Sequence, residues 1–310
     1  MADRQRPDLL RVKPVPHPGR WISAVVVGLI FMGIVYSMVT NPTYRWDLVG
    51  QYLFDPRVVG GVGWTLVLTV AAMALGIVLA VTMAIMRQSQ NPVMRVVSWV
   101  YIWFFRGTPI YTQLVFWGLI SVLYPRIVVG VPFGPEFFAF STKDVINATV
   151  GAILGLGLNE GAYLSEIVRS GLNSVDKGQW EAATALGMKR GQILRRIIIP
   201  QAMRVIVPPT GNETISMLKT TSLVLAVPFT MELTFVTNII GNRSFQPVPL
   251  LLVAAIWYLA ITSILMVGQH YLEAYYGRGF DDAQRPGGRP RKYEASRASL
   301  NQLSSEGVQA

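Results

Sequence analysis

Residues 58–86 read VVGGVGWTLVLTVAAMALGIVLAVTMAIM, a stretch without a charged side chain. Only its glycines, its threonines and Trp64 interrupt the apolar run. A helix of about 20 apolar residues crosses the hydrocarbon core of a bilayer, so this stretch is long enough to span it. The stretch therefore predicts a transmembrane helix, and with it a membrane protein.

Five further stretches reach a comparable length, which makes six predicted transmembrane helices in an all-α integral membrane protein. They cover residues 21–39, 96–123, 146–168, 205–240 and 248–271, of which 205–240 is the least regular. The first has the basic flanks of a signal peptide. Its apolar run is too long for one, however, and no small-x-small cleavage site follows before Asn41, so we expect a retained anchor.

The composition agrees with this class of protein. Hydrophobic residues make up 52% of the 310 residues and charged residues 14%, whereas average soluble chains carry about 25% charged residues. The absence of cysteine excludes disulfides and thiolate sites. The sequence also lacks a glycine-rich phosphate loop and an H-E-x-x-H motif. We therefore expect no catalytic residues in this chain and no ATPase activity of its own.

The net charge of +10 is unevenly distributed along the chain. With six spans and the amino terminus inside, about four times as many lysines and arginines lie inside as outside. Arg106 and Lys219 fall at membrane depth. The bias predicts that both termini are cytoplasmic, and it explains the positive charge without a nucleic-acid partner.

One expected cytoplasmic loop, residues 169–204, is longer than a connection requires. Within it, residues 179–188 contain helix formers, and Gly187 is well placed to end that helix. Residues 192–199 alternate arginine with isoleucine and leucine, which is typical of an interfacial helix. The short helix could enter a groove on another protein, or the whole loop could be solvated.

The spacing inside this loop resembles a known motif. Glu181-Ala-Ala is followed by three residues and Gly187, then by nine residues and Ile197, and then by one residue and Ile199-Pro200. This pattern is similar to the EAA loop of bacterial ABC import permeases, although isoleucine replaces the usual leucine before the proline. The resemblance implies that the short helix docks on a cytoplasmic ATPase and couples hydrolysis to movement of the permease.

Three more stretches resemble the polar amino-acid permeases of that family. They are Arg106-Gly-Thr-Pro-Ile-Tyr-Thr-Gln-Leu114, the set Ala162-Tyr163, Glu166-Ile-Val-Arg169 and Gly178-Gln179, and Pro209-Thr-Gly-Asn-Glu213 with Leu218-Lys-Thr-Thr-Ser-Leu223. The resemblance implies a five-helix type I importer core plus one N-terminal helix. The expected divisions are a basic cytoplasmic tail at 1–20, the extra helix and outside loop at 21–57, the core at 58–275 with the coupling loop at 169–204, and a disordered cytoplasmic tail at 276–310.

The resemblance also implies a set of partners in the bacterial inner membrane. These would be two cytoplasmic ABC ATPase subunits, an identical or homologous permease, and an extracytoplasmic binding protein that delivers a polar amino acid. ATP and magnesium would bind to the ATPase, and this chain would contact only substrate, protein and membrane lipid. By position, the residues expected to contact the ATPase are Glu181, Ala182, Ala183, Leu186 and Gly187.

Ionisable side chains at membrane depth are functional candidates, because each costs at least ~2.5 kcal/mol to insert. The chain has Arg106, Glu160, Glu213, Lys219 and Glu232 there. The candidates for the substrate pathway are Asn159, Glu160, Tyr163, Lys219, Thr220, Thr221 and Ser222, and those for structure or gating are Arg106, Thr108, Pro109, Asn212 and Glu213. Prolines at 208 and 209 are expected to break the fifth span.

Two roles remain open for Glu160. An acid that faces the cavity unpaired would favour a cationic or amide side chain in the substrate, whereas an ion pair with Lys219 would serve structure alone. Arg106 or Lys219 could likewise pair with Glu213 to hold the bundle together. In the outside loop 125–143, four phenylalanines could receive the binding protein or form an interfacial belt.

Two other classes of protein compete with the importer permease. A secondary transporter driven by an ion gradient would use the intramembrane carboxylates as proton carriers, but six spans without an evident repeat are few for one. A membrane scaffold or sensor would not transport at all. The secondary transporter would also leave the EAA-like loop without a purpose. The sequence leaves open the amino acid carried, the identity of the second permease and the role of the N-terminal helix.

Overall fold

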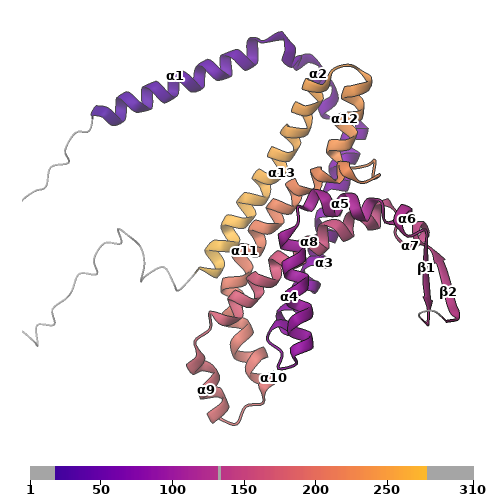
Figure 1. The fold of residues 1–310 in the computed structure, drawn as a ribbon. Helices are drawn as coiled ribbons and strands as arrows, with labels where there is room; N and C mark the ends of the chain where they lie inside the picture. Colours follow the sequence, from indigo (N-terminus) through magenta and orange to yellow (C-terminus); the bar gives the residue numbers. More distant parts are fainter. Residues whose placement is uncertain (1–17, 132–133, 278–310) are drawn as a thin grey trace, which may run out of the picture. The chain divides into compact units, whose positions relative to one another are not determined.

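The computed structural model describes residues 18–131 and 134–277, so the tails expected at 1–20 and 276–310 lie almost wholly outside the described residues. Nearly all of the described chain is helical (Figure 1). The elements are α1 (Pro18–Thr40), a 3-10 turn (Pro42–Tyr44), α2 (Trp46–Leu53), α3 (Pro56–Arg87), α4 (Pro92–Gly107), α5 (Ile110–Gly118), α6 (Ile120–Leu123), β1 (Arg126–Gly130), β2 (Glu136–Ser141), α7 (Thr142–Val145), α8 (Ala148–Asn173), α9 (Lys177–Ala185), α10 (Arg190–Ile193), a π-helical turn (Leu194–Ile198), α11 (Ile199–Thr220), a 3-10 helix (Thr221–Ala226), α12 (Leu233–Arg243) and α13 (Pro247–Tyr276).

The chain divides into two compact units. One comprises Met1–Trp64 and Thr230–Trp257, and the other comprises Thr65–Phe229 and Tyr258–Ala310. In the first unit, the Trp257 indole donates a hydrogen bond to the Leu53 carbonyl (2.8 Å). Gly61 lies against the backbone of Leu233, where a Cβ would be 3.0 Å from the Leu233 Cα. Both the candidate site and the coupling loop lie in the second unit.

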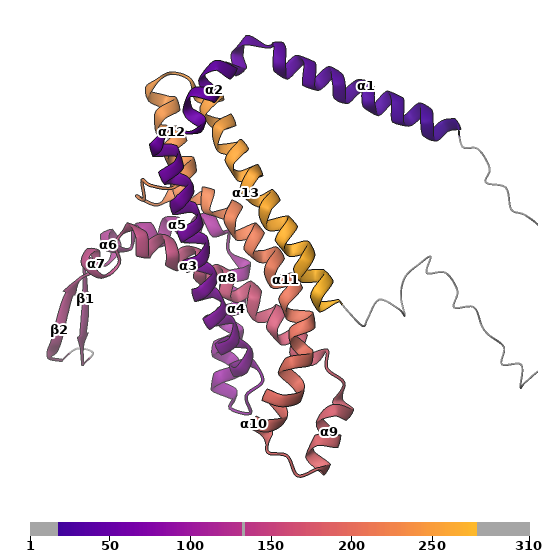
Figure 2. The same ribbon diagram turned by 180° about the vertical axis from the view of Figure 1, so that it is seen from behind.

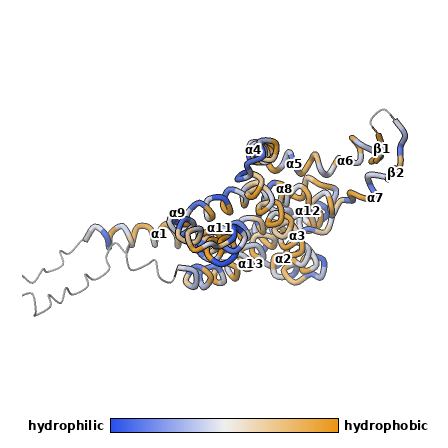
Figure 3. The backbone as a smooth tube through the Cα atoms, turned by 90° about the horizontal axis from the view of Figure 1, so that it is seen from below, coloured by the Kyte–Doolittle hydropathy of each residue, from blue (hydrophilic) through white to orange (hydrophobic). Residues whose placement is uncertain are grey.

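Three described helices are long and apolar enough to cross a membrane. They are Gly19–Thr40, Pro56–Arg87 and Pro247–Tyr276, which correspond to the first, second and sixth predicted spans. Figure 3 colours much of α3 orange, as its apolar sequence requires. None of the membrane-compatible part of the first of these helices is buried.

Two other predicted spans are not continuous helices, although an interruption was expected only in 205–240. Residues 96–123 form α4, α5 and α6, because Pro109 adopts an extended conformation (φ −63°, ψ 134°) and separates α4 from α5. Residues 205–240 form α11, a 3-10 helix and α12. The fourth span corresponds to α8, which has 26 residues. Several of them are ionisable, and these side chains lower the mean hydropathy of the helix.

The expected break at Pro208 and Pro209 was also wrong, since α11 continues through both residues. A proline inside a helix removes a donor, and a membrane helix tolerates it when neighbouring helices supply other partners. The two prolines remove the helical donors of the Arg204 and Val205 carbonyls, and nearby the side-chain amide of Gln269, on α13, donates to the Pro208 carbonyl (2.8 Å). Gly211 leaves the room for Gln269, because a Cβ at this position would collide with the Gln269 amide.

A glycine-rich face of α8 forms the centre of the second unit. A Cβ at Gly155 would lie 2.7 Å from the Leu114 Cδ2, and one at Gly157 would lie 2.7 Å from the Leu75 Cδ2. Both glycines therefore let neighbouring helices approach closely. In Figures 1 and 2, α8 lies beside α11 within this unit.

The outside loop forms an antiparallel hairpin that the sequence analysis did not anticipate. Arg126 pairs with Ser141 and Val129 with Phe138, and an irregularity follows Val129. All of β2 is exposed, including its three phenylalanines. Phe138 and Phe140 stack with their centroids 6.5 Å apart.

Candidate functional site

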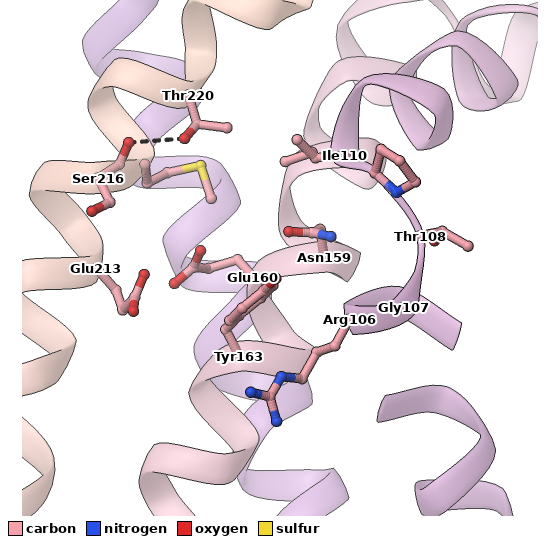
Figure 4. Close-up of a pocket in the computed structure, with 12 residues that line it drawn as sticks. Arg106, Gly107, Thr108, Ile110, Asn159, Glu160, Tyr163, Glu213, Ser216 and Thr220 are labelled. Atoms are coloured by element: carbon pink, nitrogen blue, oxygen red, sulfur yellow. Dashed lines mark hydrogen bonds between the residues drawn. The ribbon is translucent and has the colours of Figure 1, made fainter. Parts of the chain in front are cut away.

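A cavity of about 420 Å³ lies in the second unit where three segments meet (Figure 4). The break between α4 and α5 contributes Arg106, Gly107, Thr108, Pro109 and Ile110, α8 contributes Asn159, Glu160 and Tyr163, and α11 contributes Glu213, Ser216, Met217 and Thr220. The cavity thus combines two carboxylates, one guanidinium, an aromatic ring and several hydroxyls. Such a set suits a zwitterionic ligand, which needs both donors and acceptors.

The carboxylate of Glu160 is the most deeply placed polar group of the cavity. Only 5% of the residue is exposed, and Oε1 is buried without a hydrogen-bond partner among the described residues. Figure 4 shows Glu160 on α8 and Glu213 on α11 on opposite sides of the same space. An unpaired acceptor at this depth is costly unless a donor reaches it. A ligand that carries donors would supply that partner.

Asn159 braces the wall of the cavity. Its Nδ2 donates to the Phe105 carbonyl (2.8 Å) and to the Gln113 Oε1 (3.2 Å). Gln113 in turn donates to the Thr108 hydroxyl (2.7 Å) and carbonyl (3.1 Å). These bonds satisfy the backbone that the break at Pro109 leaves free, so the amide of Asn159 holds the loop in position.

Arg106 lies over the ring of Tyr163, with its guanidinium carbon 5.2 Å from the ring centroid. Neither Arg106 nor Lys219 takes part in the ion pairs found among the described residues. The pairing with Glu213 or Glu160 that the sequence left open is therefore not formed. Arg106 instead contacts α8 through a cation–π interaction.

Four of the proposed site residues lie outside the cavity. Lys219 and Asn212 line a separate pocket of about 360 Å³, together with Gln269, His270 and Glu273. Thr221 is fully buried and donates to the Leu218 carbonyl (2.7 Å), while Ser222 is half-buried and donates to the Lys219 carbonyl (2.7 Å). Positions 212, 215, 216 and 219 share one stripe of α11, and positions 213, 216, 217 and 220 share the neighbouring stripe that lines the cavity. Only Ser216 lines both pockets among these positions.

The cavity is also lined by four residues that the sequence did not single out as site residues: Gly107, Ile110, Ser216 and Met217. Ser216 lies three residues after Glu213 and four before Thr220, so the helical repeat alone would have placed it on the same face. Glu232, counted among the residues at membrane depth, caps α12, and its Oε2 accepts from the Thr234 amide (2.7 Å).

The coupling loop forms the short helix that the sequence predicted. Helix α9 begins after Asp176, whose Oδ1 accepts from the Gly178 amide, and ends at Ala185. Gly187 follows with φ +72°, a conformation that glycine adopts without strain. Figure 2 shows α9 and α10 at one end of their unit.

A small core supports this helix. Ala183, Ile193 and Ile198 are buried together, and Arg190 lies over the Trp180 ring at 6.0 Å. Ala183 therefore faces inward and stabilises the loop. Leu186 is 82% exposed. Glu181, Ala182 and Gly187 are exposed as well, so four of the five expected contact residues are accessible.

The chain matches known transport proteins over most of its length. Residues 72–276 match the family described as the binding-protein-dependent transport system inner membrane component. The chain belongs to this family. The matched segment includes the cavity and all of the coupling loop.

Individual relatives support this membership. The chain is 50% identical to the arginine transport system permease protein ArgU of Corynebacterium glutamicum over 90% of its own length and 86% of that protein. It is 36% identical to the histidine/lysine/arginine/ornithine transport system permease protein HisM of Salmonella typhimurium, covering 66% of this chain and 84% of that one. A crystal structure described as an amino acid ABC transporter with histidines has a TM-score of 0.59 at 30% identity, covering 73% of this chain and 97% of that chain.

Membership of this family confirms that the chain is an importer permease and excludes a secondary transporter. As a component of this family, the chain is a non-catalytic membrane subunit, and its ATPase is a separate protein. The similarity to the solved ABC transporter also confirms the mostly helical permease fold.

Proposed function

We propose that this permease translocates an amino acid with a cationic or amide side chain through the cavity between α4, α8 and α11. The observation that carries the proposal is the buried Glu160 carboxylate, whose Oε1 has no partner among the described residues. A substrate guanidinium or ammonium would donate to it in a charge-assisted hydrogen bond. The ArgU relative, an arginine permease by its name, supports this choice.

The rest of the cavity suits the α-amino and α-carboxyl groups. Arg106 is the cationic side chain that lines it, and Ser216 and Thr220 contribute hydroxyls from α11. Glu213, on the same helix face, would hold the α-ammonium. The proposed ligand then places its carboxylate toward Arg106 and its side chain toward Glu160.

The proposed assembly is an identical or homologous permease pair with two cytoplasmic ATPase subunits, which bind ATP and magnesium, and an extracytoplasmic binding protein. Exposed residues Glu181, Ala182 and Leu186 would contact the ATPase. The chain would cross the membrane six times, through a five-helix core at 58–275 and α1, with both termini cytoplasmic. The crossings near residues 96–123 and 205–240 would be made by broken helices.

The orientation has a direct test because the chain contains no cysteine. Single replacements A139C, in the hairpin, and Q192C, in the coupling loop, provide one label on each expected side. A membrane-impermeant maleimide added to intact cells should label A139C alone. Labelling of Q192C in intact cells would overturn the orientation.

The transport activity is tested with the complete complex in proteoliposomes. Uptake of labelled arginine should require ATP on the ATPase side, and excess arginine or glutamine should compete better than glutamate. Uptake that persists without ATP would exclude the importer, and stronger competition by glutamate would exclude the proposed substrate class.

A further inference from the structure

A second basic site lies away from the transport cavity, at the junction of α3 and α4. A pocket of about 310 Å³ is lined by Arg87, Pro92, Arg95, Val96 and Trp99. Arg87 and Trp99 also line an adjoining pocket of about 550 Å³, which extends along α4 past Trp103 to Arg106 and Gly107 at the edge of the transport cavity. In Figures 1 and 2, this junction lies at the same end of its unit as α9 and α10.

The positive charge of this pocket has no counterpart among the described residues. The Nη1 of Arg87 is buried and has no hydrogen-bond partner there. Neither Arg87 nor Arg95 forms one of the described ion pairs. Glu166, the acid that lines the adjoining pocket, is already held by Arg169, whose Nε and Nη2 donate to its Oε2 at 2.8 and 2.6 Å.

Two guanidinium groups that line one pocket suit a phosphate. The planar guanidinium donates two parallel hydrogen bonds to phosphate oxygens, and it is desolvated more readily than an ammonium. A buried donor without an acceptor is costly, so an anionic oxygen at Arg87 would stabilise the pocket.

The surface next to the arginines is apolar and aromatic. Trp99 and Trp103 stack with their centroids 6.1 Å apart, and they are 52% and 62% exposed. Val96 and Val100 extend the same exposed surface along α4. A free anion would leave this surface uncovered. A ligand with a phosphate head and an apolar body would contact both parts, and exposed tryptophans beside basic residues are typical of the membrane interface.

We propose that the pocket at Arg87 and Arg95 binds the headgroup phosphate of an anionic phospholipid, with an acyl chain along Trp99 and Trp103. Basic pockets between transmembrane helices on the cytoplasmic side recognise such headgroups. The site is independent of the substrate and needs only the membrane location of the chain. Because α4 runs from this pocket to Arg106, it joins the lipid site to the wall of the transport cavity.

The test is native mass spectrometry of the detergent-purified full chain with phosphatidylglycerol. Binding should exceed that of phosphatidylcholine. It should weaken about fivefold for R87Q or R95Q alone and on the order of 30-fold for R87Q/R95Q. The matched control R195Q/R196Q removes two exposed arginines from the π-helical turn and should bind as the wild type does.

Each alternative has its own result. Equal loss in R87Q/R95Q and R195Q/R196Q would mean general charge attraction and would overturn the site. Displacement of the lipid by an equimolar amount of inorganic phosphate would identify a soluble anion site instead. The variant R87K/R95K keeps the charge but not the bidentate geometry, so it should bind more weakly than the wild type and more tightly than R87Q/R95Q. If R87Q/R95Q elutes and melts as the wild type does, a loss of lipid cannot be attributed to unfolding.

Discussion

The guanidinium carbon of Arg106 lies 5.2 Å from the centre of the Tyr163 ring, so α4 and α8 are joined across one wall of the transport cavity. Arg106 forms no ion pair among the described residues. The Tyr163 ring therefore positions the Arg106 side chain, and it leaves the guanidinium available to a carboxylate of the substrate.

The role of this contact is tested by two substitutions of Tyr163. Phenylalanine keeps the ring face, so Y163F should transport within about twofold of the wild type. Leucine removes the cation–π interaction, worth about 0.5–2 kcal/mol, so Y163L should raise the KM for uptake several-fold. Equal KM values in Y163F and Y163L would show that the ring does not position Arg106.

Close packing at Gly157 predicts a stability effect. In Gly157→Ala the new Cβ would lie 2.7 Å from the Leu75 Cδ2 and 3.0 Å from its Cβ. Overpacking of this kind costs about 1–3 kcal/mol, so the melting temperature in detergent should fall. Gly63→Ala on α3 is the matched control, because nothing lies within 4 Å of its Cβ position. If both variants melt at the same temperature as the wild type, α8 is not packed as described.

The turn at Gly187 predicts an effect on assembly. Its φ of +72° costs other residues roughly 1–2 kcal/mol, with asparagine among the exceptions. Gly187→Val should therefore reduce co-purification of the ATPase, while Gly187→Asn should retain it. Gly191→Val, in α10, also has open space around its Cβ and no positive φ, and it should assemble normally. Full recovery of the ATPase with Gly187→Val would contradict the proposed coupling helix.

At the start of α3, the ion pair between Asp55 and Arg57 is expected to make a pH-dependent contribution to stability. A side-chain hydrogen bond from Arg57 holds the pKa of the Asp55 carboxyl below its usual range. Asp55 also accepts from the Arg57 amide (2.9 Å). Because the folded pKa is lowered, the stabilisation is present above the ordinary pKa of aspartate, about 3.9, and is lost as pH falls through the folded pKa.

Two substitutions of Asp55 separate these contributions. At pH 7, the asparagine of D55N can still accept from the Arg57 amide but no longer forms the ion pair. D55N should therefore lose at most ~1 kcal/mol of unfolding free energy. D55A also loses the cap and should lose about 1 kcal/mol more. The difference between wild type and D55N, measured by thermal unfolding, should shrink as the pH falls below the ordinary pKa of aspartate and should vanish once the pH is below the lowered pKa of folded Asp55. A difference that stays constant throughout acidification would rule out the ion pair as its cause.

Much of the fold follows from local sequence, because apolar length and glycine spacing are local properties. Residues 58–86 predicted α3, and Gly187 predicted the end of α9. The break at Pro109 was missed, and the break in 205–240 was expected at the wrong residues, since apolar content does not reveal where a helix ends. At Pro208 the neighbouring Gln269 supports the helix, and that contact spans 61 positions of the sequence.

The candidate site was predictable to a similar extent. The cost of a charge in the membrane singled out Glu160 and Glu213, and both line the cavity. The same rule also selected Lys219, which lies on another face of α11. The bracing role of Asn159 depends on a bond to Gln113, 46 positions away, and no local pattern reports such a contact.

The central claim is that Glu160 selects the side chain of the substrate. Its most direct test is the ATPase activity of the reconstituted complex, with binding protein, stimulated by arginine, glutamine or glutamate. Glu273→Gln is the matched control, because its carboxylate lines the separate pocket and already accepts from Gln269 (2.8 Å). Wild type and Glu273→Gln should prefer arginine to glutamate, and in Glu160→Gln this preference should fall about tenfold or more. An unchanged ranking of the three amino acids in Glu160→Gln would contradict the claim.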